Sequence, residues 1–181
     1  NIIPVMDLSI IIPAYNEEQN IGYLLRRLLA QRETFFSIEK IIVLSDASCD
    51  ATDREVQNVL DNRIQLVRNA KREGQAVCQN ILFQRANTDV VVLFEGDTLP
   101  QGKNFLANLL EPMVSGKFTE VAYSNVVPVA SPSTIGKAVL LQYSIYHSLY
   151  IADSNLKKNF SSGRSGRAFT KTVYTKLRWP K

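Results

Sequence analysis

Short apolar runs, many of them β-branched, alternate along this chain with longer stretches whose apolar residues recur at helical spacing. The short runs predict buried strands. They cover Leu8–Ile12, Ile38–Leu44, Ile64–Val67, Asp89–Phe94 and Val121–Val127. The stretches between them predict helices over about 17–29, 50–60, 74–86 and 105–110, with a further apolar helix near 139–151.

This alternation predicts an α/β fold in which a mainly parallel, Rossmann-like sheet carries helices on both faces. No repeat or low-complexity linker interrupts the pattern, so we expect a single domain over residues 1–181. Ligands of such sheets bind beyond the carboxyl ends of the strands, where the strand order reverses. The turns that follow the strands are therefore the first place to look for chemistry.

Polar and acidic residues follow three of the predicted strands. The first turn is Pro13–Glu17, in which we expect Asn16 to cap the next helix and Glu17 to lie in its first turn. The second turn is Ser45–Thr52 and the third is Glu95–Pro100. Because parallel strands end at the same edge, the sequence predicts one site built from all three turns.

Glu95-Gly96-Asp97 is the most informative triplet in these turns. Two carboxylates one residue apart, at the end of a buried strand, can face one ligand. Oxygen ligands of this kind suit Mn²⁺ or Mg²⁺, which usually bind through one or two carboxylates together with substrate phosphates. The alternative is an acidic turn that is merely solvated.

Four segments together resemble the motifs of family 2 glycosyltransferases of the GT-A fold. Ile11–Glu17 is similar to the opening IIPxYNE motif, and Asp46–Thr52 to the DGSxDxT segment. Arg68-Asn69, followed by Gly74, Ala76 and Asn80, resembles RNxGxxxAxN, and Glu95-Gly96-Asp97 stands where the family has its DxD motif. The four match in order and in approximate spacing across residues 8–100.

The resemblance implies a hexosyltransferase-like enzyme that moves a sugar from a UDP- or GDP-sugar to an acceptor, lipid-linked or polysaccharide, with inversion and with Mn²⁺ or Mg²⁺. It implies that Asp97 ligates the metal and that Glu95 contacts the ribose or the metal shell. The residues implied to line the nucleotide-sugar site are Pro13, Tyr15, Glu17, Asp46, Lys71, Glu95 and Asp97.

Each of these residues also has a simpler interpretation. Pro13 would then end a strand, Tyr15 would be an aromatic residue at a rim, and Glu17 would serve the helix dipole. Asp46 would form a turn. For the chain as a whole, the alternative is a nucleotide-sugar binding module without catalysis. A sugar nucleotidyltransferase is less favoured, because Pro13–Asn16 is not a glycine-rich phosphate loop.

Three positions depart from the family pattern. Ser45 stands where the family usually has a further Asp, and Glu95 replaces the first Asp of DxD. Gln75 stands where the family often has Lys, although Lys71 and Arg72 are near enough in sequence to supply the charge. These departures bear on base identity and metal affinity rather than on the fold.

The resemblance also places the catalytic base, an acidic residue, beyond the segment that matches Gly166–Phe169. Residues 170–181 contain no Asp or Glu. We therefore expect the base to lie beyond Lys181, the domain to be truncated at that end, and this chain to bind donor but to turn over poorly.

Charge is distributed unevenly along the chain. Residues 1–153 hold 13 basic and 17 acidic side chains, whereas 154–181 hold eight basic and none that are acidic. Either further sequence balances this tail, or the tail faces phosphates or an anionic membrane surface, next to a helix rich in Tyr. The tail carries no nucleic-acid-binding motif, so we expect no nucleic acid partner.

Cys49 and Cys78 lack metal-ligand spacing, and we expect both to be buried thiols in a reducing compartment. No run of about 18–20 apolar residues is present. These features predict a cytoplasmic protein, peripheral at the inner face of the membrane.

Overall fold

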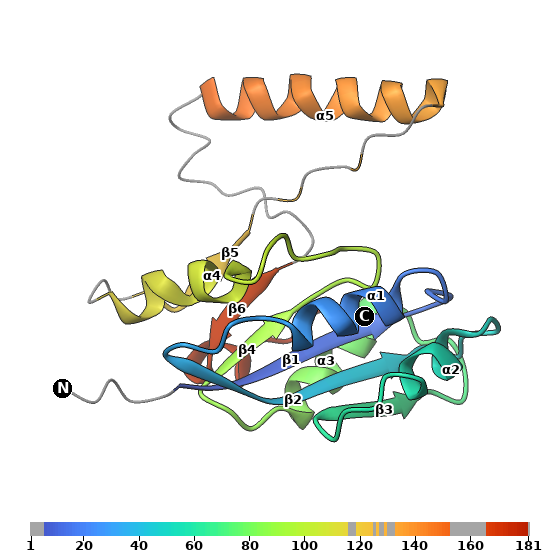
Figure 1. The fold of residues 1–181 in the computed structure, drawn as a ribbon, viewed down its shortest axis with the longest axis vertical. Coiled ribbons are helices and arrows are strands. Elements are labelled where there is room, and N and C mark those ends of the chain that lie inside the picture. Colours follow the sequence, from blue (N-terminus) through green and yellow to red (C-terminus); the bar gives the residue numbers. More distant parts are fainter. Residues whose placement is uncertain are drawn as a thin grey trace. The chain divides into compact units, whose positions relative to one another are not determined.

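The computed structural model describes residues 6–115, 119–124, 126, 129, 133–152 and 166–180. They fall into two compact units, Asn1–Ser124 with Arg164–Lys181, and Asn125–Gly163. The expectation of one domain over the whole chain therefore stays a prediction. Among the described residues, the first unit contains the six strands and all helices except α5 (Figure 1).

A six-stranded sheet in the order β3-β2-β1-β4-β6-β5 forms the centre of the first unit. β1, β2, β3 and β4 run parallel, whereas β6 is antiparallel to both β4 and β5. The strands are β1 (Met6–Ala14), β2 (Phe36–Ser45), β3 (Ile64–Arg68), β4 (Val90–Leu93), β5 (Val121–Tyr123) and β6 (Arg167–Thr170). The mainly parallel α/β fold expected from the sequence is confirmed.

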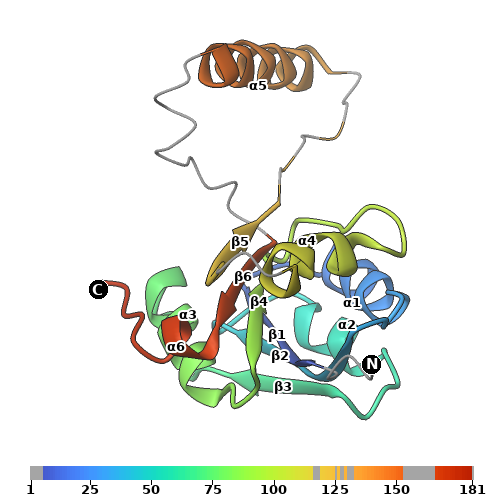
Figure 2. The same ribbon diagram turned by 90° about the vertical axis from the view of Figure 1, so that its left-hand side faces the viewer.

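Helices cover both faces of this sheet (Figure 2). Alternate residues of a strand point to opposite faces. Ile10 and Ile12 accordingly pack with α1 (Ile21–Leu29), α2 (Thr52–Gln57) and α4 (Phe105–Val114). Ile11 packs on the other side, with α3 (Gln75–Arg85) and α6 (Lys171–Tyr174). Because β1 is buried on both faces, its sequence is a continuous run of apolar residues rather than an alternation of apolar and polar residues.

The first helix starts later than the sequence suggested. α1 begins at Ile21, with Asn20 at its N-cap and no acidic residue in its first turn. The expectation that Asn16 caps this helix, with Glu17 in its first turn, is wrong. Asn16 adopts a left-handed conformation (φ 56°), and the chain turns there before Glu17 accepts the backbone N–H groups of Asn20 and Ile21.

The strand expected over Val121–Val127 is shorter. It ends at Tyr123, and most of residues 125–132 lie outside the described part of the chain. β6 was not expected at all, and it lies between β4 and β5. Gly166, immediately before β6, has φ +67°, and a Cβ there would lie 2.3 Å from the Ser124 hydroxyl oxygen, so only glycine fits.

The second unit contains α5 (Thr134–Ala152). Several of its apolar side chains are exposed, namely Ile135, Val139, Leu141 and Ile145. Among the described residues, no helix is both long enough and apolar enough to cross a membrane.

Candidate nucleotide-sugar site

The strand order reverses between β1 and β4, and the turns that follow these two strands carry the residues singled out by sequence. β2 and β3 add two more turns beside them. An edge where the order reverses is where ligands of open parallel sheets bind. The described residues bring the three predicted turns to this one edge.

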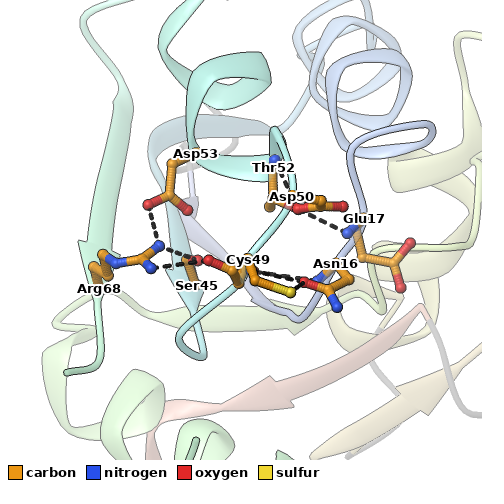
Figure 3. Close-up of polar contacts among 9 residues, drawn as sticks. Asn16, Glu17, Ser45, Cys49, Asp50, Thr52, Asp53 and Arg68 are labelled. Atoms are coloured by element: carbon orange, nitrogen blue, oxygen red, sulfur yellow. Dashed lines mark hydrogen bonds and ion pairs between the residues drawn. The ribbon is translucent and has the colours of Figure 1, made fainter. Parts of the chain in front are cut away.

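Hydrogen bonds fasten the β1–α1 loop to the β2–α2 loop (Figure 3). The backbone N–H of Asn16 donates to the Ser48 hydroxyl (3.2 Å), and that of Glu17 to the Thr52 hydroxyl (2.7 Å). In return, the Cys49 N–H donates to the Asn16 side-chain oxygen (2.9 Å). These hydrogen bonds from Asn16, Ser48 and Thr52 therefore fix the two loops to each other.

Cys49 differs from expectation. It is exposed beside Asn16, whereas Cys78 is buried as expected. Burial, reinforced by the nearby Asp46 carboxylate, raises the pKa of the Cys78 thiol to about 12. The expectation that both thiols are buried is wrong for Cys49, because the loop that carries it turns outward to meet Asn16.

Asp46 is buried, with 4% of its surface exposed. One oxygen accepts the Asn69 side-chain amide (2.8 Å) and the Glu73 N–H (2.9 Å), and the other accepts the Gly74 N–H (2.8 Å). Burial acts to raise the pKa of Asp46, but these hydrogen bonds outweigh it and hold the pKa below its usual range. The carboxylate therefore fixes the loop between β3 and α3.

Ser45, at the end of β2, is fully buried and donates to the Ser48 hydroxyl (3.0 Å). Arg68 contacts both residues of this pair, because it donates to the Ser45 hydroxyl (3.5 Å) and to the Ser48 carbonyl (2.9 Å). It is also ion-paired with Asp53. Ser45 thus takes part in a neutral hydroxyl pair, in the place where the resemblance would put a carboxylate.

Glu95 follows β4 with only 13% of its side chain exposed. Gln75 donates to one of its oxygens (2.8 Å) and Gln79 to the other (3.5 Å). Arg167 of β6 lies 3.5 Å from the same carboxylate. Burial lowers the pKa of Arg167, and the charge of Glu95 opposes that shift. Three donors therefore already surround Glu95.

The Glu17 side chain packs against Gly96, in the middle of the Glu95-Gly96-Asp97 turn. A Cβ at Gly96 would lie 2.7 Å from Cγ of Glu17, so only glycine lets the two turns approach this closely. Burial raises the pKa of Glu17; the Asn20 amide opposes this shift, and the negative charge of Asp97 adds to it. Asp97 is exposed, and the described residues offer it no hydrogen bond or ion pair.

Tyr15 and Arg72 form a stacked pair at this edge. The guanidinium carbon of Arg72 lies 3.8 Å from the centre of the Tyr15 ring. Lys71, which sequence had placed in the site, is 81% exposed and pairs with Glu73 at 3.4 Å. Pro13 is buried within β1, opposite Leu44 of β2.

The structure thus brings Tyr15, Glu17, Glu95 and Asp97 to one edge and shows contacts that sequence reasoning had missed. Arg167 was expected as part of the basic tail and of the matched segment Gly166–Phe169, and nothing in the sequence linked it to Glu95. The Arg72–Tyr15 stack could not be read from spacing, because the residues are far apart in the chain. Within the described residues, no group of three or more His, Cys, Asp or Glu side chains forms a ready metal centre.

The family model for glycosyl transferase family 2 matches residues 9–173. This match spans most of the chain, and the chain therefore belongs to that family. Its fold is the GT-A fold expected from the motifs.

Three known proteins illustrate the similarity. An Escherichia coli protein named UDP-Glc:alpha-D-GlcNAc-diphosphoundecaprenol beta-1,3-glucosyltransferase is 29% identical over 145 residues, which are 78% of this chain and 54% of that protein. A Mycobacterium tuberculosis glucosyl-3-phosphoglycerate synthase, solved with Mn²⁺ and UDP-glucose, has TM-score 0.66 and 19% identity over 95% of this chain and 58% of that one. A Pyrobaculum calidifontis mannosyltransferase, solved with GDP-mannose and Mn²⁺, has TM-score 0.59 and 23% identity over 68% and 36%. The chain thus spans about half the length of the curated relative.

Proposed function

We propose that this chain binds the nucleotide-sugar donor of an inverting, metal-dependent glycosyltransferase that transfers a hexosyl unit. The observation that carries the proposal is the close approach of Glu17 to the Glu95-Gly96-Asp97 turn where the strand order reverses, with Asp97 exposed and without a described partner. An open carboxylate at this edge is what a divalent cation on a diphosphate requires.

Of the two carboxylates in this turn, Asp97 is open to a divalent cation and Glu95 is already engaged by other side chains. Asp97 has free oxygens among the described contacts and would hold Mn²⁺ or Mg²⁺, which would stabilise charge on the departing diphosphate. Glu95 already accepts from Gln75 and Gln79 and pairs with Arg167. We therefore assign Glu95 to the surroundings of the metal and Asp97 to direct ligation.

The donor is a UDP- or GDP-sugar. Two of the similar structures were solved with UDP-glucose or GDP-mannose and Mn²⁺, which supports this choice. The relative from Escherichia coli acts on a diphosphoundecaprenol-linked sugar. A lipid-linked acceptor is consequently our choice over a polysaccharide, and it would bring the protein to a membrane surface.

In an inverting transfer, the acceptor hydroxyl attacks the anomeric carbon as the bond from that carbon to the diphosphate oxygen breaks. The electron pair leaves with the diphosphate, and the hydroxyl proton passes to a base. The residues at this edge serve the leaving side of that step. Asp97 would act on the diphosphate only through the divalent cation that it would ligate.

A thermal-shift series tests the proposal. UDP, GDP and CDP are added to the protein with Mn²⁺ or with EDTA. Binding at about a hundredfold over Kd stabilises a protein by roughly 2.7 kcal/mol, or several degrees in Tm. We expect UDP or GDP to raise Tm with Mn²⁺ and to do so much less with EDTA.

Asp97→Asn should remove the Mn²⁺-dependent part of this shift and leave the Tm of the free protein unchanged. Glu111→Gln, which neutralises an exposed carboxylate on α4, is the matched control and should behave as wild type. Equal shifts for Asp97→Asn and wild type would contradict the assignment of Asp97. Slow Mn²⁺-dependent hydrolysis of UDP-glucose or GDP-mannose would distinguish an enzyme from a binding module.

A further inference from the structure

Arg72 stands out among the cations at the site edge because its charge is not balanced. Arg68 pairs with Asp53, Lys71 with Glu73, and Arg167 with Glu95. Arg72 has no carboxylate partner in the described part of the chain, and its side chain is held by a ring instead. A cation kept in place without a counter-charge is available to an anionic ligand.

The stacking geometry determines which part of Arg72 is available. With its central carbon 3.8 Å from the ring centre, the guanidinium lies against the face of Tyr15. Stacking of this kind covers the face of the guanidinium, while its N–H donors point outward from the edge. A planar fork of donors fits two phosphate oxygens at once. Tyr15 therefore restrains the cation without using its hydrogen-bonding groups.

The loop that carries Arg72, between β3 and α3, is held in place by Asp46. The Asp46 carboxylate accepts from Asn69, Glu73 and Gly74. Gly74 is the N-cap of α3, so this carboxylate already lies at the start of the helix. What remains available to an external anion is the unpaired charge of Arg72.

Gln75 and Lys71 supply no free cation at this edge. The Gln75 amide is directed to Glu95 at 2.8 Å, so this position supplies a neutral hydrogen bond to a carboxylate and no cation. Lys71 is one residue from Arg72, but it is turned to Glu73. Arg72 is the remaining cation in this loop.

We propose that Arg72, held against Tyr15, binds the diphosphate of the nucleotide-sugar donor. The inference rests on the proposed function, since it takes the ligand to be a nucleoside diphosphate. It assigns the phosphate contact to Arg72 rather than to Lys71, and to the diphosphate rather than to the base.

Isothermal titration with two ligand pairs, UDP against uridine and GDP against guanosine, separates these contacts when Mn²⁺ is held constant. Arg72→Gln should weaken the binding of the preferred diphosphate by about ten- to a hundredfold, the range of one charge-assisted contact. Binding of the matching nucleoside should change by less than about twofold, because it carries no phosphate for Arg72 to contact. Arg72→Lys, which keeps the charge but loses the fork, should fall between.

Arg85→Gln is the matched control, because it removes one positive charge from an exposed residue at the last position of α3. It should leave diphosphate affinity within about twofold of wild type. Equal losses in Arg85→Gln and Arg72→Gln would overturn the inference in favour of a general charge effect, and a larger loss in Lys71→Gln than in Arg72→Gln would overturn the choice of Arg72. A parallel loss for uridine or guanosine in Arg72→Gln would overturn it in favour of a contact with the base.

The proposed donor-binding function and the proposed role of Arg72 are contradicted by different results of this experiment. If the wild-type protein binds neither UDP nor GDP with Mn²⁺, the proposed function itself is wrong. If the wild type binds one of them and Arg72→Gln binds it equally well, the proposed function stands and the role of Arg72 is wrong.

Discussion

At the scale of single residues, Asp46 shows how a charge is accommodated inside this protein. Its carboxylate is almost fully buried, yet three hydrogen-bond donors from the loop before α3 surround it. Two of those donors are backbone N–H groups that would otherwise lack partners in the loop. Asp46 and Asp97 thus have opposite surroundings, one enclosed by donors and the other open to solvent, although they lie at the same edge.

This contrast predicts that the two aspartates differ in what they support. Asp46→Asn replaces one acceptor oxygen with an NH₂ group that faces a donor, and should lower the free energy of unfolding at pH 7 by about 1–3 kcal/mol. Asp97→Asn should leave that quantity within about 0.5 kcal/mol of wild type. Urea denaturation of both variants measures the difference. A similar loss of stability in both would contradict the distinction.

The pH dependence of the Asp46 contribution follows from its lowered pKa. The Asp46 carboxyl binds its proton less tightly in the folded protein than in the unfolded chain. Its contribution to the free energy of unfolding is therefore complete above the unfolded pKa of about 3.9. This contribution is lost as the pH falls below that value, toward the folded pKa. The stability gap between wild type and Asp46→Asn should therefore narrow from pH 7 toward acid. A gap that stays constant down to pH 3 would contradict this account.

At the scale of elements, the segment that follows β6 is attached to α3 through the Asn80 side chain. The Asn80 amide donates to the Trp179 carbonyl (2.9 Å) and accepts from the Trp179 backbone N–H (2.8 Å). These two hydrogen bonds are the same pair that a neighbouring strand would make with Trp179. Tyr174 fastens the start of the same segment, because its hydroxyl donates to the Thr88 carbonyl at 2.6 Å. The Trp179 ring lies beside Arg167, with 5.8 Å between the guanidinium carbon and the ring centre.

Trp179 is the only tryptophan in the chain, so its fluorescence reports on this attachment. Asn80→Asp cannot donate to the Trp179 carbonyl and would repel it. We expect a red-shifted emission maximum and stronger quenching by acrylamide, with the far-UV circular dichroism unchanged. Gln84→Glu adds the same charge to an exposed position of α3 and should leave the emission unaltered. Identical spectra for Asn80→Asp and wild type would show that the segment is held by other contacts.

The elements also show what sequence could and could not predict. β1, β2 and β4 are buried runs of Ile, Val and Leu, and such runs predict strands wherever the sheet is covered on both faces. β6 has only four residues and begins with Arg167, a residue that sequence reasoning places at a surface. It pairs with both β4 and β5, its Ala168 and Phe169 are buried, and Glu95 supplies the counter-charge of Arg167. The partner is supplied by the tertiary fold, and no local pattern contains it.

The same reasoning applies to the candidate site. The motifs indicated which turns carry the site residues, because each turn follows a strand that the apolar pattern defines. They did not reveal that Gln75 and Arg167 surround Glu95, or that Arg72 lies on Tyr15. Those contacts depend on how α3 and β6 pack beside β4 and β1. The sequence thus indicated which residues belong to the candidate site, but not which of them contact one another.

At the scale of the whole molecule, charge is divided between the two ends of the chain. Eight basic residues and no acidic ones occupy positions 154–181. One of the eight, Arg167, is engaged by Glu95. An acceptor attached to a lipid would require a protein that approaches a bilayer, and a basic segment without acids favours an anionic surface.

We therefore expect vesicles that contain anionic lipid to retain the protein at low ionic strength and to release it at high salt. The Debye length falls from about 10 Å at 0.1 M salt to about 3 Å at 1 M, which is enough to screen surface charges. Co-sedimentation measures retention, and vesicles of neutral lipid alone are the control. Equal retention on neutral vesicles would exclude an electrostatic cause.

The position of β6 between β4 and β5 has a consequence for the order in which this protein acquires its structure. β5 pairs only with β6 among the described strands, and about 40 residues separate the two along the chain. β1 to β4 can associate as soon as residue 93 is available, whereas β5 cannot join the sheet until residue 170 has been made. Closing so long a loop is slow compared with forming local contacts. During synthesis, the edge at which β1 and β4 end would thus exist before Arg167 arrives to pair with Glu95.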